Sequence, residues 1–492
     1  MSSRGLLIDA GAEQAEPWAS IERFDPGESH TAVTTLASVA ALGGFLFGYD
    51  SAVINGAVTA IGAHYHTDAG TLGFAVASAL LGAAVGALAA GKLADSVGRR
   101  WAMRVAAVLF LISAVGTGLA GSLAMLIVFR VIGGVGVGVA SVIAPAYIAE
   151  IAPARIRGRL GSLQQLAIVL GIFAALLIDY VLDTAAGGSE KNLAGVPAWR
   201  WMFLAMTIPA VIYGIGAFLI PESPRYLVAK DRLEEAGEVL RRVLGNIDIP
   251  GKLREIQHTI AREVKPTLRD LQGPALGLLP IVWVGIGLSV FQQLVGINVI
   301  FYYSSVLWQA VGFSESSSLI ITVITSVVNI VTTLIAISRI DRSGRRPLLI
   351  IGSIGMTVTL GAMALIFGTA PLNAHGEPVL NGAAGPIALI SANLFVFAFG
   401  LSWGPVVWVI LGEKFPNRIR AAALSVAAAA QWVANWAIST SFPALKNAGL
   451  GLAYGIYAAS ALLSLFFVLR FVSETKGKEL EEMTEDVRVA LP

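Results

Sequence analysis

Long apolar runs alternate with short polar loops along the whole 492-residue chain. A helix needs about 20 apolar residues to cross the hydrocarbon core of a bilayer, and twelve runs reach that length. Such continuous runs predict helices, whereas a membrane β-barrel would show short segments of alternating polarity. The predicted spans are residues 33–58, 71–94, 101–121, 123–147, 160–182, 200–220, 275–310, 316–340, 347–368, 385–411, 421–442 and 449–472.

Basic residues gather in every second loop. The stretches "GKLADSVGRRW", "PARIRGR", "DRSGRRP" and "EKFPNRIR" follow spans two, four, eight and ten, whereas loops such as "GAHYHTDAG" and "VGFSESSS" hold no Lys or Arg. Cytoplasmic loops of membrane proteins carry an excess of Lys and Arg. The pattern therefore predicts a multi-pass protein of the cell (cytoplasmic) membrane with both termini in the cytoplasm.

The two halves of the chain repeat each other. "LADSVGRRW" matches "RIDRSGRRP", "AEIAPARIRG" matches "GEKFPNRIRA", and "PESPR" matches "SETKG", in the same order and roughly 250 residues apart. Ordered matches of this kind indicate a duplicated six-helix unit. The predicted domains are a cytoplasmic tail at 1–32, a six-helix half at 33–221, a cytoplasmic helical linker at 222–272, a second half at 273–472 and a tail at 473–492.

The linker has apolar residues at helical spacing with charges between them, which predicts amphipathic surface helices. We expect it to pack under the helix bundle, and a binding module for another protein is the alternative.

Composition narrows the possible functions. Only 13% of the residues are charged, against roughly 25% in ordinary soluble domains, and the net charge of +2 provides no basic face for nucleic acid. No cysteine is present, which excludes disulfides and thiolate metal sites. The motifs of P-loop ATPases, zinc proteases and serine hydrolases do not occur. We therefore expect no enzyme and no cofactor, and "HYH" at His64–His66 lacks a third ligand for a metal.

Span seven contains the polar stretch "FQQLVGINVIFYY" inside an otherwise apolar run. Side-chain amides are costly in hydrocarbon unless they are hydrogen-bonded. They either tie helices together or line a polar site. Asn298 and Tyr302 are four residues apart and share a helix face, whereas Gln292 and Gln293 do not fall on it. A bend at Gly296 is expected to aim both sets inward.

Taken together, the "GRR" loops, "PESPR", "QQLVGIN" and the repeated Glu-x6-Arg resemble the sugar porter family of the major facilitator superfamily. The resemblance covers all twelve spans and departs at Ser473, where the family usually has Pro. It implies an all-α membrane protein with twelve transmembrane helices in two pseudo-symmetric halves. It also implies alternating-access uptake of a monosaccharide by a functional monomer in the lipid bilayer. The family includes bacterial proton-coupled glucose and xylose symporters and animal facilitative glucose transporters.

The resemblance also implies a sugar pocket at mid-depth. Amides donate and accept hydrogen bonds without a charge to desolvate, which suits a neutral, hydroxyl-rich ligand. Ile172 and Phe301 match glucose-type members, and Gly400 replaces an acid of passive animal-type members. D-glucose is therefore expected, with D-xylose, galactose and inositol open. The implied sugar-binding residues are Gln165, Gln292, Gln293, Asn298, Tyr302, Asn329, Trp408, Gln431, Trp432 and Asn435.

Asp50 and Arg130 are predicted to form a buried pair. Each lies about eight residues from the outer end of its span, which places both roughly 12 Å below the outer surface at 1.5 Å per residue. We take them to be the only ionisable residues well inside the membrane in the first half. A lone buried charge is costly, so pairing is expected. In the family an acid at this position accompanies proton-coupled members, which implies proton symport; a static ion pair is the alternative.

The resemblance implies that the charged residues of the basic loops form networks that hold the cytoplasmic side closed in the outward-facing state. The same residues also set the topology of the chain in the membrane. These residues are Asp95, Arg99, Arg100, Glu150, Arg157, Glu222, Arg225, Asp341, Arg345, Arg346, Glu413 and Arg420.

Other transport proteins fit less well. A passive sugar facilitator keeps the pocket, but Asp50 argues against it. A transport-inactive sugar sensor is expected to carry long soluble tails, and a drug exporter is expected to have a more apolar pocket.

Overall fold

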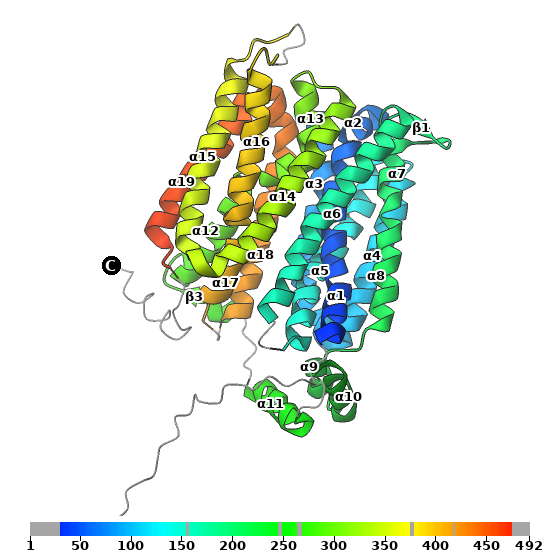
Figure 1. The fold of residues 1–492 in the computed structure, drawn as a ribbon, viewed down its shortest axis with the longest axis vertical. Coiled ribbons are helices and arrows are strands. Elements are labelled where there is room, and N and C mark those ends of the chain that lie inside the picture. The colour runs from blue at the N-terminus through cyan, green and yellow to red at the C-terminus, as the bar shows by residue number, and fades with distance from the viewer. Residues whose placement is uncertain are drawn as a thin grey trace, which may run out of the picture.

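The computed structural model describes residues 30–153, 157–244, 248–262, 268–373, 378–416 and 419–474. It is an all-helical bundle with short two-stranded hairpins (Figure 1). The all-α prediction is confirmed. Most of the two predicted tails lies outside the described residues.

The first group of helices, which we call the N-terminal bundle, runs from residue 30 to 219. A hairpin of β1 (Asn192–Leu193) and β2 (Val196–Pro197) connects its last two spans. The helices are α1 (His30–Ala52), α2 (Ile54–Tyr65), α3 (Ala69–Val97), α4 (Arg99–Gly118), α5 (Leu123–Ile151), α6 (Arg157–Ala186), α7 (Ala198–Ala205) and α8 (Thr207–Leu219).

The second group, the C-terminal bundle, runs from residue 280 to 471. Its helices are α12 (Pro280–Leu294), α13 (Ile297–Ala310), α14 (Glu315–Ser343), α15 (Arg345–Thr369), α16 (Ala384–Leu401), α17 (Trp403–Lys414), α18 (Arg420–Ala448) and α19 (Leu450–Phe471).

The polar stretch between the bundles folds into short helices. Their apolar faces pack on one another through residues such as Leu227, Val228 and Ala236, as the amphipathic pattern predicts. Figure 1 shows α9–α11 at one end of the molecule, which we call the linker end. The elements are α9 (Pro224–Ala229), α10 (Leu233–Leu244), α11 (Ile249–Arg262), the 3-10 helix η1 (Leu268–Leu271), β3 (Gln272–Gly273) and β4 (Gly277–Leu278).

Eleven helical segments of the described chain are long and apolar enough to cross a membrane. They coincide with eleven of the twelve predicted spans to within a few residues at most ends. The remaining predicted span corresponds to α18, which has 29 residues but carries several amide and hydroxyl side chains. A polar face on a membrane-length helix is expected where the helix borders a polar site rather than lipid.

The two bundles meet through symmetry-related helices. Helix α3 of the N-terminal bundle packs against α18 of the C-terminal bundle, which pairs span two with span eleven. Helix α6 of the N-terminal bundle packs against α14 of the C-terminal bundle, which pairs span five with span eight. The approach of α3 to α18 is close: a Cβ on Gly73 would lie 2.3 Å from the carbonyl oxygen of Thr440. A larger residue at Gly73 would therefore force the bundles apart.

A polar contact joins the bundles at the end opposite the linker. Asn55 of α2 donates from Nδ2 to the Phe301 carbonyl of α13 at 3.1 Å. Ser305 donates from its hydroxyl to the Asn55 carbonyl at 2.6 Å and from its backbone N–H to Asn55 Oδ1 at 3.3 Å. All three residues are buried. We call this end the sealed end.

Four of the described spans are interrupted. Span one breaks at Val53, span six at Met206, span seven at Gly296 and span ten at Ser402. Gly296 has a left-handed conformation with φ of +79°, which a residue with a Cβ adopts only at a cost. The bend predicted at Gly296 is confirmed. Broken helices free backbone groups and re-aim side chains, which is how many transporters build midplane sites.

Candidate functional site

Three amides of span seven form one hydrogen-bonded chain across the break. Asn298 Nδ2 donates to Gln293 Oε1 at 2.5 Å, and Gln293 Nε2 donates to Gln292 Oε1 at 3.4 Å. Gln292 and Gln293 are buried and Asn298 is half-buried. The break at Gly296 therefore brings the two sets of amides together, although they do not share a face on an ideal helix.

Gln292 is the anchor of this chain. Its Nε2 donates to the carbonyl oxygens of Trp403 at 2.8 Å and Gly404 at 3.1 Å, at the start of α17. These carbonyls follow the break at Ser402. Gln292 therefore ties the interruption of span seven to that of span ten, so in this conformation its amide N–H groups act between helices.

Tyr302 joins the amides of α18 to α1. Its side chain lies close enough to Asn435 of α18 and to Ser51 of α1 to interact with both. Asn435 Oδ1 also accepts from the Ser439 hydroxyl at 3.1 Å. Ser51 is the neighbour of Asp50, so one tyrosine connects an expected sugar ligand in one bundle to the buried acid in the other.

The remaining expected sugar ligands are spread over four helices. Asn329 of α14 is buried, and a Cβ on Gly400 would lie 3.6 Å from its Oδ1, so these two predicted pocket residues are neighbours. Trp432 of α18 packs against Phe47 of α1, with ring centroids 5.7 Å apart. Trp408 of α17 is 43% exposed. Gln165 and Gln431 are half-buried, and Gln431 Oε1 has no partner among the described residues.

The two side chains expected to set selectivity differ in exposure. Ile172 of α6 is half-buried and packs against the core, and a Cβ on Gly48 of α1 would lie 2.9 Å from its backbone nitrogen. Phe301 is 4% exposed, and its carbonyl belongs to the contact with Asn55. Phe301 therefore contributes to the sealed end as well as to the core.

Asp50 and Arg130 lie together, as predicted. Arg130 Nη1 is 3.4 Å from Asp50 Oδ2, and both side chains are 2% exposed. The same nitrogen donates to the Asp50 backbone carbonyl at 2.8 Å. Neither carboxylate oxygen accepts a hydrogen bond from a described residue. The guanidinium is thus held by the backbone, and the carboxylate is neutralised by charge alone.

The expectation that Asp50 and Arg130 are the only ionisable residues deep in the first half is wrong. Asp179 and Asp183 of α6 are fully buried, and Arg104 of α4 is 9% exposed. Asp179 Oδ2 accepts from the backbone N–H of Gly56 at 3.1 Å. The signal was present in the sequence, because Asp179 falls inside the predicted span 160–182 and Asp183 directly follows it.

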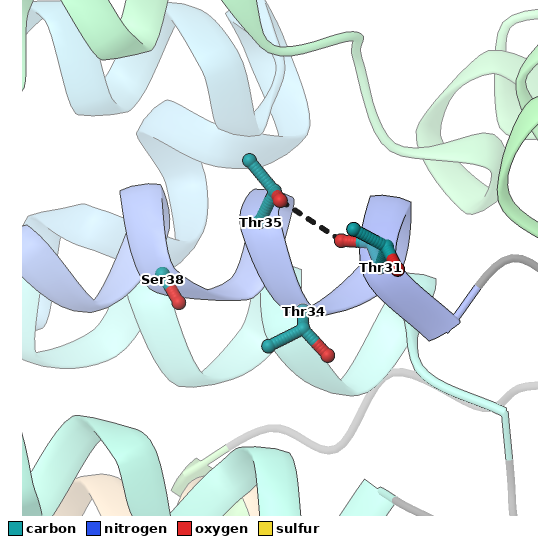
Figure 2. Close-up of a pocket in the computed structure, with 4 residues that line it drawn as sticks. All are labelled: Thr31, Thr34, Thr35 and Ser38. Carbon is teal, nitrogen blue, oxygen red and sulfur yellow. Dashed lines mark hydrogen bonds between the residues drawn. The ribbon is translucent and has the colours of Figure 1, made fainter.

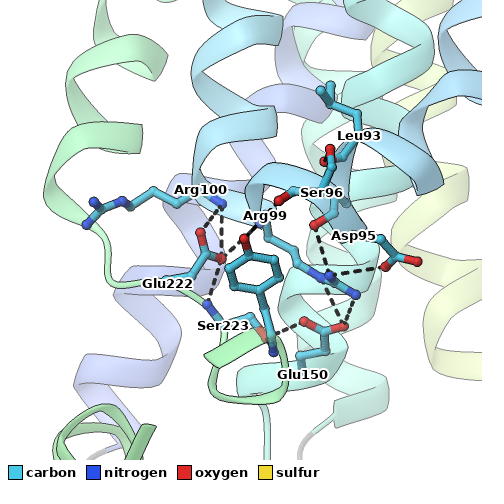
Figure 3. A network of polar contacts seen from close by, with 10 residues as sticks. Leu93, Asp95, Ser96, Arg99, Arg100, Glu150, Glu222 and Ser223 are labelled. Atoms are coloured by element: carbon cyan, nitrogen blue, oxygen red, sulfur yellow. Dashed lines mark hydrogen bonds and ion pairs between the residues drawn. The ribbon is translucent and has the colours of Figure 1, made fainter. Parts of the chain in front are cut away.

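A charged network at the linker end brings several predicted residues together (Figure 3). Arg99 Nη2 donates to Glu150 Oε1 at 2.9 Å, and Arg99 Nη1 lies 3.5 Å from Asp95 Oδ1. Glu222 Oε1 accepts from the backbone N–H of Arg99 at 2.9 Å, and its Oε2 from that of Arg100 at 3.2 Å. The hydroxyl of Ser223 donates to Glu150. The network holds α9 against the ends of α3, α4 and α5.

The second bundle repeats this arrangement with Glu474. The backbone N–H groups of Arg345 and Arg346, at the start of α15, donate to Glu474 at 3.0 Å each. Gly98 and Gly344 precede the two helices, and a Cβ on either would lie within 3 Å of the capping carboxylate. Glu474 occupies the position in "SETKG" that Glu222 occupies in "PESPR". The sequence repeat therefore indicated Glu474 as a network residue, although it was not among the predicted members.

Arg225, a further predicted member of the network, lies in α9 and is half-buried. The side chains of Arg157, Asp341, Glu413 and Arg420 lie outside the described part of the chain.

A cavity of about 470 Å³ opens beside the first turns of α1. Figure 2 shows its lining, Thr31, Thr34, Thr35 and Ser38, and the bond from the Thr35 hydroxyl to the Thr31 carbonyl at 2.8 Å. The cavity is lined by hydroxyls at the start of the helix and is separate from the amide cluster.

No cluster of His, Asp or Glu suited to a metal ion occurs among the described residues. His64 instead packs edge-on against Tyr65, with ring centroids 4.7 Å apart.

Comparison with known proteins is consistent with this geometry. Residues 36–487 match the family described as Sugar (and other) transporter. The chain is 59% identical over 454 residues to the glucose transport protein of Synechocystis sp., covering 92% of this chain and 97% of that protein. It is 39% identical over 484 residues to the D-xylose-proton symporter of Escherichia coli, covering 92% and 95%.

Solved structures agree with this similarity. The chain is similar to the inward-open conformation of the xylose transporter XylE from E. coli, with a TM-score of 0.78, 36% identity, and coverage of 92% of this chain and 99% of that chain. For XylE bound to 6-bromo-6-deoxy-D-glucose the TM-score is 0.74, with 37% identity and the same coverage. The predicted fold class is therefore confirmed.

Proposed function

Because the chain belongs to the sugar transporter family of the major facilitator superfamily, we propose that it takes up a monosaccharide by proton symport with alternating access. The observation that carries the proposal is the position of Tyr302. It interacts with Asn435 on the expected sugar side and with Ser51, the sequence neighbour of the buried Asp50. Sugar and proton sites that share a contact are positioned to influence each other.

Orientation follows from the distribution of basic loops. We place the linker end, with the networks around Glu222 and Glu474, in the cytoplasm of a cell membrane, and both termini with it. The sealed end then faces outward. The hydrogen bonds around Asn55 join the bundles at that end, which supports an inward-facing state for this conformation.

Coupling would act through the Asp50 carboxylate. It lacks hydrogen bonds from described residues and is balanced only by Arg130 at 3.4 Å. A change in that distance between the inward and outward states changes the affinity of Asp50 for a proton. Sugar binding that favours one state is then linked reciprocally to proton binding.

The substrate we propose is D-glucose. Amides and aromatic faces suit a neutral sugar, and Ile172 and Phe301 follow the glucose-type pattern. The 59% identical relative is a glucose transport protein, whereas the E. coli relative carries D-xylose. Xylose, galactose and inositol remain the competitors to test. We propose a functional monomer in the bilayer, with the proton as coupling ion and no cofactor.

A passive facilitator is the second candidate, and one observation favours it. Arg130 is fastened to the Asp50 backbone carbonyl at 2.8 Å, so the pair could stay in place in both states as a structural element.

Uptake of labelled D-glucose into proteoliposomes, with and without an inward proton gradient, separates these candidates. We expect accumulation above equilibrium in the wild type and its loss in Asp50→Asn, while sugar exchange without a gradient survives. Glu190→Gln is the matched control, because Glu190 is an exposed acid. Equal, gradient-independent equilibration in all three proteins would establish the facilitator and refute coupling through Asp50.

A further inference from the structure

Three carboxyl groups gather at the sealed end, where α6 meets α14. Asp183 lies in the last turn of α6, Asp179 one turn earlier, and Glu315 is the first residue of α14. Asp179 and Asp183 are 0% exposed. Within the described residues, none of the three makes an ion pair with Lys, Arg or His. Buried carboxylates without a counter-charge are costly.

The bundles exchange hydroxyl donors at this point. The Ser316 hydroxyl, from the C-terminal bundle, donates to Asp183 Oδ2 at 2.9 Å. The Ser189 hydroxyl, from the N-terminal bundle, donates to Glu315 Oε1. Each acid is therefore held by a hydroxyl of the other bundle. Separating the bundles at this end would break both contacts and admit water.

We infer that Asp183, which faces Glu315 across the boundary between the bundles, is a second proton-binding site, separate from Asp50, whose protonation holds the sealed end closed. The inference rests on the alternating access of the proposed function, but not on proton coupling through Asp50.

Helix ends decide which of the two acids holds the proton. Glu315 begins a helix, where the macrodipole favours a negative charge, whereas Asp183 lies near the end of one, where it does not. Asp183 Oδ1 and Asp179 Oδ1 are buried, and neither accepts a hydrogen bond from a described residue. Asp183 also interacts electrostatically with Glu315 and with Asp179. A proton on Asp183 removes the repulsion between like charges at the centre of the cluster.

The charged and titratable groups around the pair do not replace that proton. Tyr49 of α1 interacts electrostatically with Asp179, and α2 contributes the backbone N–H of Gly56, which donates to Asp179 Oδ2. On α7, Arg200 donates to the Gly118 carbonyl and contacts His64. The loop after Ser189 carries one acid and one base, Glu190 and Lys191, both exposed, and Arg130 of α5 is paired with Asp50.

The direction of the pH effect follows from burial. In the closed state Asp183 is buried and faces the like charge of Glu315, so it binds a proton more tightly than in the open, hydrated state. The closed state therefore gains population as the pH falls. If one proton is involved, the ratio of closed to open molecules changes by at most tenfold per pH unit. The change occurs in the pH range between the proton affinity of the open state and that of the closed state.

Spin-label distances across the sealed end test this directly. The chain has no cysteine, so two introduced cysteines would carry the only spin labels. Suitable positions are Ala63→Cys on α2 and Ala383→Cys before α16, which are exposed and belong to different bundles. Distances are measured in lipid nanodiscs from pH 5 to 9, with and without D-glucose. We expect the short-distance population of the wild type to rise several-fold as the pH falls.

Neutral variants give the decisive comparison. Asp183→Asn/Glu315→Gln should stay closed at every pH and lose the pH slope, and Asp183→Asn alone serves if the double variant folds poorly. Glu190→Gln and Asp50→Asn should keep the slope. A double variant or Asp183→Asn that keeps the wild-type slope overturns this inference and leaves the proposed function standing. A wild type with one distance at every pH and sugar concentration would overturn alternating access as well.

Discussion

The N-terminal bundle contains two sets of buried acids that are stabilised in different ways. Asp50 has a cation, Arg130, from a helix of the same bundle, 3.4 Å away. Asp183 has no described cation and instead accepts a hydrogen bond from Ser316 of the other bundle. The first set is internal to one bundle, and the second crosses the boundary between them.

This difference determines what protonation can do. A proton on Asp183 changes the energy of a contact that exists only while the bundles touch. A proton on Asp50 changes nothing across the boundary unless another group connects the two bundles. Tyr302, which contacts Ser51 and Asn435, is the group in position to do so. The internal site therefore depends on a relay, whereas the boundary site acts directly.

Removing the cation of the internal site should have the largest effect. Arg130→Leu leaves the Asp50 carboxylate buried and unpaired, which typically costs about 3–5 kcal/mol. We expect a strongly lowered thermal midpoint in detergent and little folded protein. Arg130→Leu/Asp50→Asn should recover most of that stability, because no lone charge remains. Equal instability of the single and double variants would show that Arg130 acts through its bond to the Asp50 backbone.

Breaking the relay should have an intermediate effect. Tyr302→Phe keeps the ring in its buried position but removes the hydroxyl that contacts Ser51 and Asn435. Coupling energies between sites are typically 1–3 kcal/mol, or roughly 5–150-fold, so we expect gradient-driven accumulation to fall by that order. Sugar exchange without a gradient should fall less. Tyr303→Phe is the matched control, because its hydroxyl bonds the Ser439 carbonyl within its own bundle. Equal losses in both variants would contradict the relay.

Weakening the boundary at a position without an acid should have the smallest effect. Asn55→Ala removes two of the three hydrogen bonds between α2 and α13, at roughly 1 kcal/mol each. The spin-label pair should then report fewer closed molecules at every pH, while the pH slope stays that of the wild type. If the closed population of Asn55→Ala no longer depended on pH, the pH response would belong to the sealed end as a whole rather than to Asp183 and Glu315.

Several features were determined by the sequence alone. The spans followed from run length, because only a helix of about 20 apolar residues crosses a bilayer without unpaired backbone groups. The break at Gly296 followed from the one residue in the polar stretch that adopts a positive φ freely. The pairing of Asp50 with Arg130 followed from depth, since two isolated charges at the same level in hydrocarbon are expected to meet.

The tertiary structure decided which polar groups are already engaged and with what. The sequence marks Gln292 and Gln431 as the same kind of residue, yet Gln292 is tied to the carbonyls of α17, whereas Gln431 Oε1 has no described partner. It marks Asp183 only as an acid beside a predicted span, and the contact with α14 makes it part of a boundary. Hydropathy reports the cost of burying a group at a given depth, but its partners are set by how distant helices pack, and that packing is not encoded in any one stretch of the chain.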